Sequence, residues 1–245
     1  MSEAPHPDQT MFEGVIGQEY AMLSKICPQA PIMSQCAADA AKAYRDRQNR
    51  PINIYELGGG TGITTLALLL ACPDSTIESV EIAATMQNQA RESLKNWLNE
   101  GRLQLVLNDA LSALQTLPDA SFDVIASAYT LHNFEHAYRD QVMAEIFRVL
   151  KPGGLFVNGD RYGLDDINAH TESIQLEVRR YFEVLTEMNR LDLLEQWIVH
   201  LFSDESENHV MRTHISLDLL KFLGFTDIQL SHRQQVNALV TALKP

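Results

Sequence analysis

The chain has 245 residues, of which 45% are hydrophobic and 21% charged, and this is enough for one α/β domain with a modest elaboration. Its formal net charge of −13, with basic residues only in short groups, disfavours a nucleic-acid partner and favours a small-molecule substrate. The longest apolar run, residues 66–72, is too short to span a bilayer, and the N-terminus has no signal-peptide pattern. The three cysteines, Cys27, Cys36 and Cys72, lack CxxC spacing, so the sequence predicts no disulfide framework and no metal site, and a cytoplasmic location. No membrane partner is expected, and a homodimer is left open.

The predicted elements begin with a helical segment and then alternate between strands and helices. Residues 1–50 are expected to form a lid, with helices over residues 19–26 and 31–47. Strands are predicted over residues 52–57, 76–82, 103–108, 122–126 and 155–160, and helices over 64–71, 84–100, a short piece after 109, and 137–150. Strands separated by helices in this way predict a parallel sheet with right-handed crossovers over the core, residues 51–163.

The pattern changes after residue 163. Residues 164–215 are expected to form a helical cap, because apolar residues follow one helical face as far as about Phe202, where a polar break begins. Residues 216–245 are expected to form a helix that ends at Gly224 and two strands, 226–231 and 237–243. The fold class predicted is therefore α/β, with a mostly parallel seven-stranded sheet, an antiparallel C-terminal hairpin and a helical cap.

The stretch YELGGGTG, residues 55–62, stands where the first strand turns into a helix. Ligands of open parallel sheets bind at the carboxyl ends of strands, and glycine allows them to approach the backbone closely. No lysine follows the glycines, as a triphosphate-binding loop requires, and Ile63 occupies the place of the third glycine of a dinucleotide fingerprint. Glu56 precedes the glycines and suits a ligand that carries an ammonium group better than a diphosphate.

An ordered series of motifs follows this turn. Glu81 ends the second strand in SVEIAATM, Asp109 follows the third in VLNDAL, and FDVIASAYTLHNF and LKPGGLFV come after them. Together with YELGGGTG, these motifs resemble the class I S-adenosylmethionine-dependent methyltransferases over residues 52–160. The resemblance implies a Rossmann-like fold and S-adenosyl-L-methionine as the cofactor.

The resemblance also implies which residues hold the cofactor. Glu56 and the glycines would hold the methionine moiety, Glu81 the ribose hydroxyls, and the Asp109 region the adenine. A carboxylate accepts from both hydroxyls of a ribose, and apolar side chains after the second strand suit a purine. The expected cofactor-binding residues are Glu56, Gly58, Gly60, Gly62, Glu81, Ile82, Met86, Asn108, Asp109, Ala110 and Ala128.

Residues that follow the fourth and fifth strands should face the reacting centre. The catalytic candidates are Tyr20, Tyr129, His132, Asn133, Arg161 and Tyr162, with Phe134 as a further wall residue. Tyr20 would reach the centre from the lid. Alternatives stay open: His132 is a general base, a wall of the site or part of a structural turn, and Arg161 binds a substrate carboxylate or pairs with Asp160.

The reaction implied first is in-line methyl transfer to a small molecule, driven by positioning rather than by a base. The long helical insert, the segment from Thr213 to Phe225 and the ending NALVTALK are also similar, more weakly, to the carboxy-S-adenosylmethionine synthase branch. The alternative is therefore an enzyme that consumes S-adenosylmethionine without methylation, by carboxy transfer or by cyclisation to azetidine-2-carboxylate. A silent cofactor-binding protein and a nicotinamide oxidoreductase are the remaining hypotheses.

Overall fold

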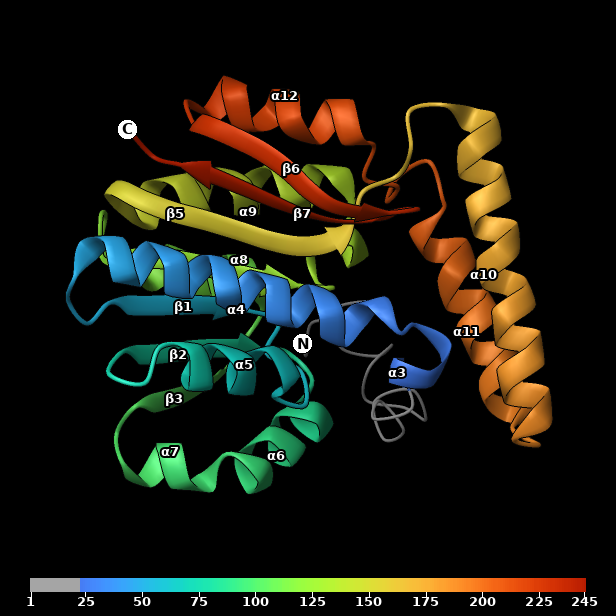
Figure 1. Ribbon diagram of the computed structural model, residues 1–245, viewed down its shortest axis with the longest axis horizontal. Coiled ribbons are helices and arrows are strands. Elements are labelled where there is room, and N and C mark those ends of the chain that lie inside the picture. Colours follow the sequence, from blue (N-terminus) through green and yellow to red (C-terminus); the bar gives the residue numbers. More distant parts are fainter. Residues whose placement is uncertain (1–22) are drawn as a thin grey trace, which may run out of the picture.

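The computed structural model describes residues 23–245, and the predicted lid residue Tyr20 lies outside this range. A seven-stranded sheet forms the centre of the molecule, in the order β3-β2-β1-β4-β5-β7-β6 (Figure 1). The strands are β1 (Asn53–Leu57), β2 (Thr76–Glu81), β3 (Leu103–Leu107), β4 (Phe122–Ala128), β5 (Leu150–Arg161), β6 (Thr226–Gln234) and β7 (Asn237–Leu243).

The first five strands run parallel, and β7 pairs with β5 in the antiparallel sense. This confirms the predicted mostly parallel sheet with its antiparallel C-terminal hairpin. The strand order reverses between β1 and β4, which is the switch point where open α/β sheets bind ligands. Because Leu57 pairs with Val80 and with Ser127, the carboxyl ends of these strands meet at one edge.

Alternating residues of β1 face two separate hydrophobic layers. On the side of Ile54 lie α4 (Gln29–Gln48), α5 (Ile63–Ala71), α6 (Ala84–Ser93) and α7 (Lys95–Asn99). On the side of Tyr55 lie α8 (Ala110–Thr116), α9 (His136–Val149) and α12 (Thr213–Leu223). The single helix predicted over residues 84–100 is two helices, because Leu94 leaves helical geometry (φ −109°, ψ 17°) and buries its side chain in the core.

A third hydrophobic cluster holds the cap at the carboxyl edge of the sheet. The helices α10 (Ile167–Glu187) and α11 (Leu191–Asp204) lie side by side beyond the arrowheads of β1 and β5, next to α3 (Leu23–Ile26) (Figure 1). Tyr181, Leu185, Leu193 and Trp197 pack there against Ile26. The chain passes from α10 to α11 at Asn189, which adopts a left-handed conformation (φ +54°). Within residues 23–245, no helix has both the length and the apolar character needed to cross a bilayer.

Candidate active site

The glycine loop between β1 and α5 has backbone conformations that L side chains rarely adopt. Gly58 has φ +66° and Gly60 has φ +55°. A Cβ atom at Gly58 would lie 2.1 Å from Oγ1 of Thr130, so no side chain fits there without rearrangement. The loop therefore presents backbone rather than side chains at these two positions.

Glu81 ends β2 beside this loop, and its carboxylate is almost fully buried. Its two oxygens accept hydrogen bonds from the backbone N–H groups of Gly60 (2.9 Å) and Ala83 (2.8 Å). Burial raises the pKa of Glu81, although these N–H groups act in the opposite direction. Each oxygen has two lone pairs, so the fixed carboxylate is still able to accept from a ligand diol.

A cleft opens between these elements, and we call it the nucleoside cleft. It is lined by Gly58, Gly60, Val80, Glu81, Ile82, Met86, Asn108, Asp109, Ala110, Tyr129, Thr130, Asn133, Phe134 and Tyr138. Most of the residues expected to bind the cofactor are thus brought together on its walls. Asp109 caps α8 by accepting from the N–H of Ser112 (2.9 Å), and it also accepts from the hydroxyl of Tyr138 (3.0 Å).

Thr130 and Tyr138 were not among the sequence-predicted residues. Thr130 stands next to Tyr129, and its position in the motif after the fourth strand was a usable signal. Tyr138 lies on α9 and reaches the cleft only because α9 packs against α8. No local pattern of the sequence indicated that contact.

Glu56 does not line the cleft, contrary to the expectation that its carboxylate meets the ligand. In a strand alternate residues share a face, so Glu56 points with Ile54 toward α5, beneath the glycine loop. It is fully buried and accepts a hydrogen bond from the hydroxyl of Thr65 (2.6 Å). Burial raises the pKa of Glu56 to about 7. Gly62 is likewise turned inward, where a Cβ atom would lie 2.8 Å from Leu94.

A smaller cavity lies on the other side of the loop, under the first turns of α4. Its walls include Ala128, Ser34, Thr64 and Tyr129 together with the glycines of the loop. The predicted residue Ala128 is therefore beside the loop rather than in the nucleoside cleft. We call this space the loop cavity.

Tyr129 stands where the nucleoside cleft, the loop cavity and a third space meet. It is a non-glycine residue with φ +51°, a conformation that is uncommon and concentrated at functional sites. Its N–H donates to the carbonyl of Gly159 (3.1 Å), and its hydroxyl donates to Oδ1 of Asn237 (2.5 Å). These bonds to β5 and β7 hold the ring at the junction of the three spaces.

The third space, here called the acceptor cavity, lies under the cap. Charged and aromatic side chains share its walls: Cys27, Tyr129, His132, Asn133, Arg161, Glu177, Tyr181, Trp197, His200 and Asp204. Of the predicted catalytic residues within the described range, four are collected here and Tyr162 is not. Tyr162 packs in the core beneath α12, where its hydroxyl accepts from Nδ2 of Asn158 (2.8 Å).

His132 belongs to the short 3₁₀ helix η2 (Leu131–Asn133) and is fixed by Asp160 of β5. Its Nδ1 lies 2.5 Å from Oδ1 of Asp160, which is completely buried. Burial lowers the pKa of His132, but the charges of Asp160 and Asp204 outweigh it, so the pKa is raised overall. Conversely, the pKa of Asp160 is lowered: burial raises it, and the charge and hydrogen bond of His132 outweigh that effect. The pair favours a positive charge beside the cavity.

Arg161 has partners other than the expected Asp160. Successive residues of β5 point to opposite faces, so Asp160 reaches η2 while Arg161 reaches the cap. Nη1 of Arg161 donates to both oxygens of Glu177 (2.7 and 2.9 Å), and Nη2 donates to Glu205 (2.9 Å). The guanidinium thus ties β5 to α10 and to the end of α11, and a substrate carboxylate would have to compete with these acids.

The core of the chain is similar in sequence to methyltransferases and related proteins. Residues 55–158 match the family model described as "Methyltransferase domain". A demethylmenaquinone methyltransferase of Leptospira interrogans is 32% identical over 109 residues, which are 44% of this chain and 43% of that protein. A carboxy-S-adenosyl-L-methionine synthase of Hydrogenovibrio crunogenus is 24% identical over 165 residues, 65% of this chain and 62% of that protein. The chain thus spans less than half the length of the first of these relatives.

Solved structures share the whole architecture at low sequence identity. An O-methyltransferase family protein from Burkholderia thailandensis has a TM-score of 0.67 and 13% identity, over 98% of this chain and 63% of that one. The CurJ carbon methyltransferase has a TM-score of 0.66 and 18% identity, over 92% of this chain and 57% of that one. The predicted resemblance to class I methyltransferases, and the fold it implied, are therefore confirmed.

Proposed function

Because residues 55–158 match the family model of a methyltransferase domain, we propose that the chain transfers the methyl group of S-adenosyl-L-methionine to a small molecule held in the acceptor cavity. The observation that carries the proposal is the junction at Tyr129, where the two spaces beside the glycine loop adjoin a separate space under the cap. A donor and an acceptor placed in these spaces would meet at one aromatic ring.

The cofactor is assigned to the spaces on either side of the glycine loop. Glu81 would accept from the ribose hydroxyls, Ile82 and Met86 would cover the purine, and Asn108 and Asp109 would face its edge. The methionine moiety would pass the loop at Gly60 into the loop cavity, toward Ala128. Glu56 supports the loop from beneath through Thr65, rather than by contact with the ligand.

Methyl transfer requires the acceptor, the methyl carbon and the sulfur to lie in line. The acceptor forms a bond to the carbon as the carbon–sulfur bond breaks, and the electron pair of that bond stays on sulfur and neutralises the sulfonium. Positioning supplies most of the rate enhancement in such a displacement. The ring of Tyr129 would contact the sulfonium by cation–π attraction, which is worth about 0.5–2 kcal/mol. Asn133 lines both the nucleoside cleft and the acceptor cavity, and would orient the acceptor.

The aromatic and charged side chains of the acceptor cavity indicate which kind of substrate it suits. Its aromatic walls, Tyr129, Tyr181 and Trp197, suit a partly apolar molecule, and its charged groups suit one with polar substituents. The resemblance to a carboxy-S-adenosylmethionine synthase covers more of the chain than the resemblance to the quinone methyltransferase, but at lower identity.

The test is mass spectrometry of the purified protein with S-adenosylmethionine, first alone and then with pooled small-molecule acceptors. The expected result is an intact cofactor without an acceptor, and S-adenosylhomocysteine with a product heavier by one methylene group when an acceptor is present. Accumulation of methylthioadenosine above the spontaneous background would overturn the proposal, because the aminobutyryl chain would then be the reacting group. A Gly60→Val variant is the matched control for uncatalysed decay.

A further inference from the structure

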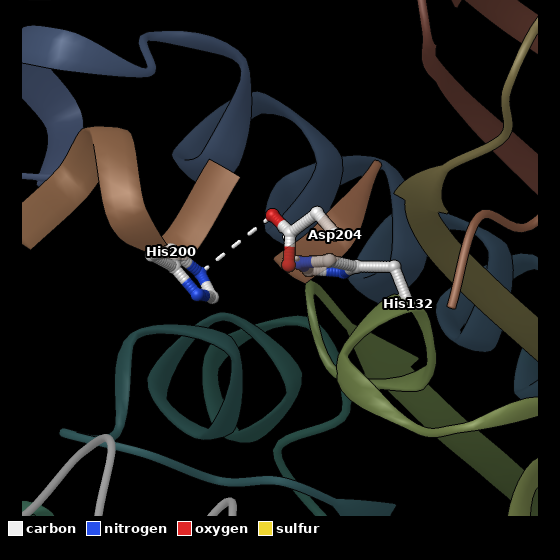
Figure 2. Close-up of side chains that lie close together, drawn as sticks. All are labelled: His132, His200 and Asp204. Carbon is white, nitrogen blue, oxygen red and sulfur yellow. Dashed lines mark ion pairs between the residues drawn. The ribbon is translucent and has the colours of Figure 1, made fainter. Parts of the chain in front are cut away.

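Three buried side chains meet on the wall of the acceptor cavity: His132 from η2, and His200 and Asp204 from α11. In Figure 2 the imidazole of His132 and the imidazole of His200 both lie near the carboxylate of Asp204. One potential ligand atom from each residue lies within 4.8 Å of the other two. We propose that this cluster, with Nε2 of His132, an imidazole nitrogen of His200 and a carboxylate oxygen of Asp204, binds a divalent transition-metal ion of the zinc type.

The contacts of Asp204 are too long for hydrogen bonds and suit an ion between the groups. Oδ2 of Asp204 lies 3.8 Å from Nε2 of His132 and 3.7 Å from Nε2 of His200. A hydrogen bond between such atoms would need about 3.2 Å or less. Ligand atoms that share an ion with bonds of about 2.0–2.2 Å stand roughly 3–3.5 Å apart, so the two contacts of Asp204 are a few tenths of an ångström longer than in an occupied site.

The two elements hold the ligands in the orientation that a metal site needs. His200 and Asp204 are four residues apart on α11, so they project from the same face of the helix. His132 is oriented by the contact of its Nδ1 with Asp160, which leaves Nε2 toward Asp204. A carboxylate behind a metal-ligating histidine is the usual supporting arrangement, because it fixes the ring and strengthens the ligand.

The charges around the cluster also favour a cation. Asp160 and Asp204 are both buried, and buried acids are normally paired or bound to metal. Besides the two imidazoles, the basic side chain that the structure describes beside Asp204 is Arg161, whose Nε lies 3.9 Å from Oδ2. Its guanidinium is already engaged by Glu177 and Glu205, so these two acids offset its repulsion of an ion.

The ligand set points to a class of ion and to a role. Two imidazoles and one carboxylate suit Zn²⁺, Co²⁺ or Fe²⁺, whereas Mg²⁺ and Ca²⁺ prefer oxygen ligands alone. Three protein ligands leave coordination positions open, and the cluster lines the acceptor cavity. On the premise of the proposed function, such an ion would hold an oxygen atom of the acceptor. The spacing of the ligands along the sequence, 132 against 200 and 204, explains why the sequence predicted no metal site.

The experiment is titration of tag-free, chelator-treated full-length protein with Co²⁺ and Zn²⁺, in the absence of S-adenosylmethionine. The expected result is one equivalent of Co²⁺ bound with visible ligand-field absorption, and its displacement by Zn²⁺. His200→Ala and Asp204→Ala should each weaken binding by at least about tenfold, and Asp160→Asn by about 10–100-fold. His214→Ala is the matched control, because His214 pairs with Asp165 at an exposed position outside the cavity.

Absence of one-equivalent binding to the wild-type protein would overturn the proposal. Equal binding by His200→Ala and by the His214→Ala control would also overturn it. Circular dichroism of each variant separates loss of ligands from loss of fold, and the Co²⁺ spectrum of the wild-type protein needs no variant. Calorimetry with S-adenosylmethionine is run in parallel: its failure would count against the proposed function while leaving the metal result intact.

Discussion

The buried carboxyl of Glu56 makes the stability of the apo protein depend on pH in a predictable direction. The side chain is fully buried under the glycine loop, and burial raises its pKa from the ordinary 4.5 to about 7. Below about pH 4.5 the carboxyl is protonated in both the folded and the unfolded states, so its ionisation does not lower the free energy of unfolding. As the pH rises toward 7, the unfolded chain ionises freely while the folded protein keeps the proton, so folding becomes less favourable.

The magnitude follows from the difference between the two pKa values. A difference of about 2.5 units (7 − 4.5) at about 1.36 kcal/mol per unit corresponds to about 3 kcal/mol of unfolding free energy, lost as the pH rises through about 7. Glu56→Gln stays neutral at every pH and removes this contribution, while its amide oxygen still accepts from Thr65. The free energy of unfolding of the variant should therefore exceed that of the wild type by an amount that grows by about 3 kcal/mol between pH 4 and pH 8.

The assay is urea denaturation of both proteins at several pH values, without cofactor, because other groups that titrate cancel in the difference between them. Glu92→Gln, at an exposed position on α6, is the matched control, because it makes the same side-chain change without altering a buried group. If the difference between Glu56→Gln and wild type is constant with pH, the carboxyl is not held protonated by burial and the reasoning is refuted.

Three further predictions concern the cofactor residues and the cap. Glu81→Gln should weaken the binding of S-adenosylmethionine by about 1–3 kcal/mol in calorimetry, because one acceptor oxygen becomes a donor, and unchanged affinity would remove Glu81 from the ribose site. Gly60→Val should abolish binding and keep the circular dichroism spectrum, because the loop backbone at φ +55° is the contact surface; normal binding would show that the ligand does not pass this loop. Arg161→Met should lower the free energy of unfolding by about 3–5 kcal/mol, because Glu177 and Glu205 lose a buried partner, and an unchanged denaturation midpoint would contradict that role.

The sequence alone determined the sheet and the edge of the sheet at which the predicted cofactor residues gather. Each parallel strand and the helix after it are formed by one continuous stretch of sequence. The turn at Gly58 and the acids Glu81 and Asp109 can therefore be identified because they stand at the ends of predicted strands. Parallel strands bring such residues to one edge whatever their distance along the chain. For this reason most of the residues expected to bind the cofactor line one cleft of the structure, and their role in binding stays a prediction.

Only the tertiary structure decided in which direction these side chains point and which residues they contact. The pleat of β1 turns Glu56 beneath the loop. The pleat of β5 turns Asp160 and Arg161 to opposite faces, so the guanidinium of Arg161 pairs with Glu177 and Glu205 instead of Asp160. The packing of α11 over η2 brings His200 and Asp204 to His132. Contacts of this kind depend on how a helix of the cap packs against the carboxyl edge of the sheet. No local pattern in the sequence encodes that packing.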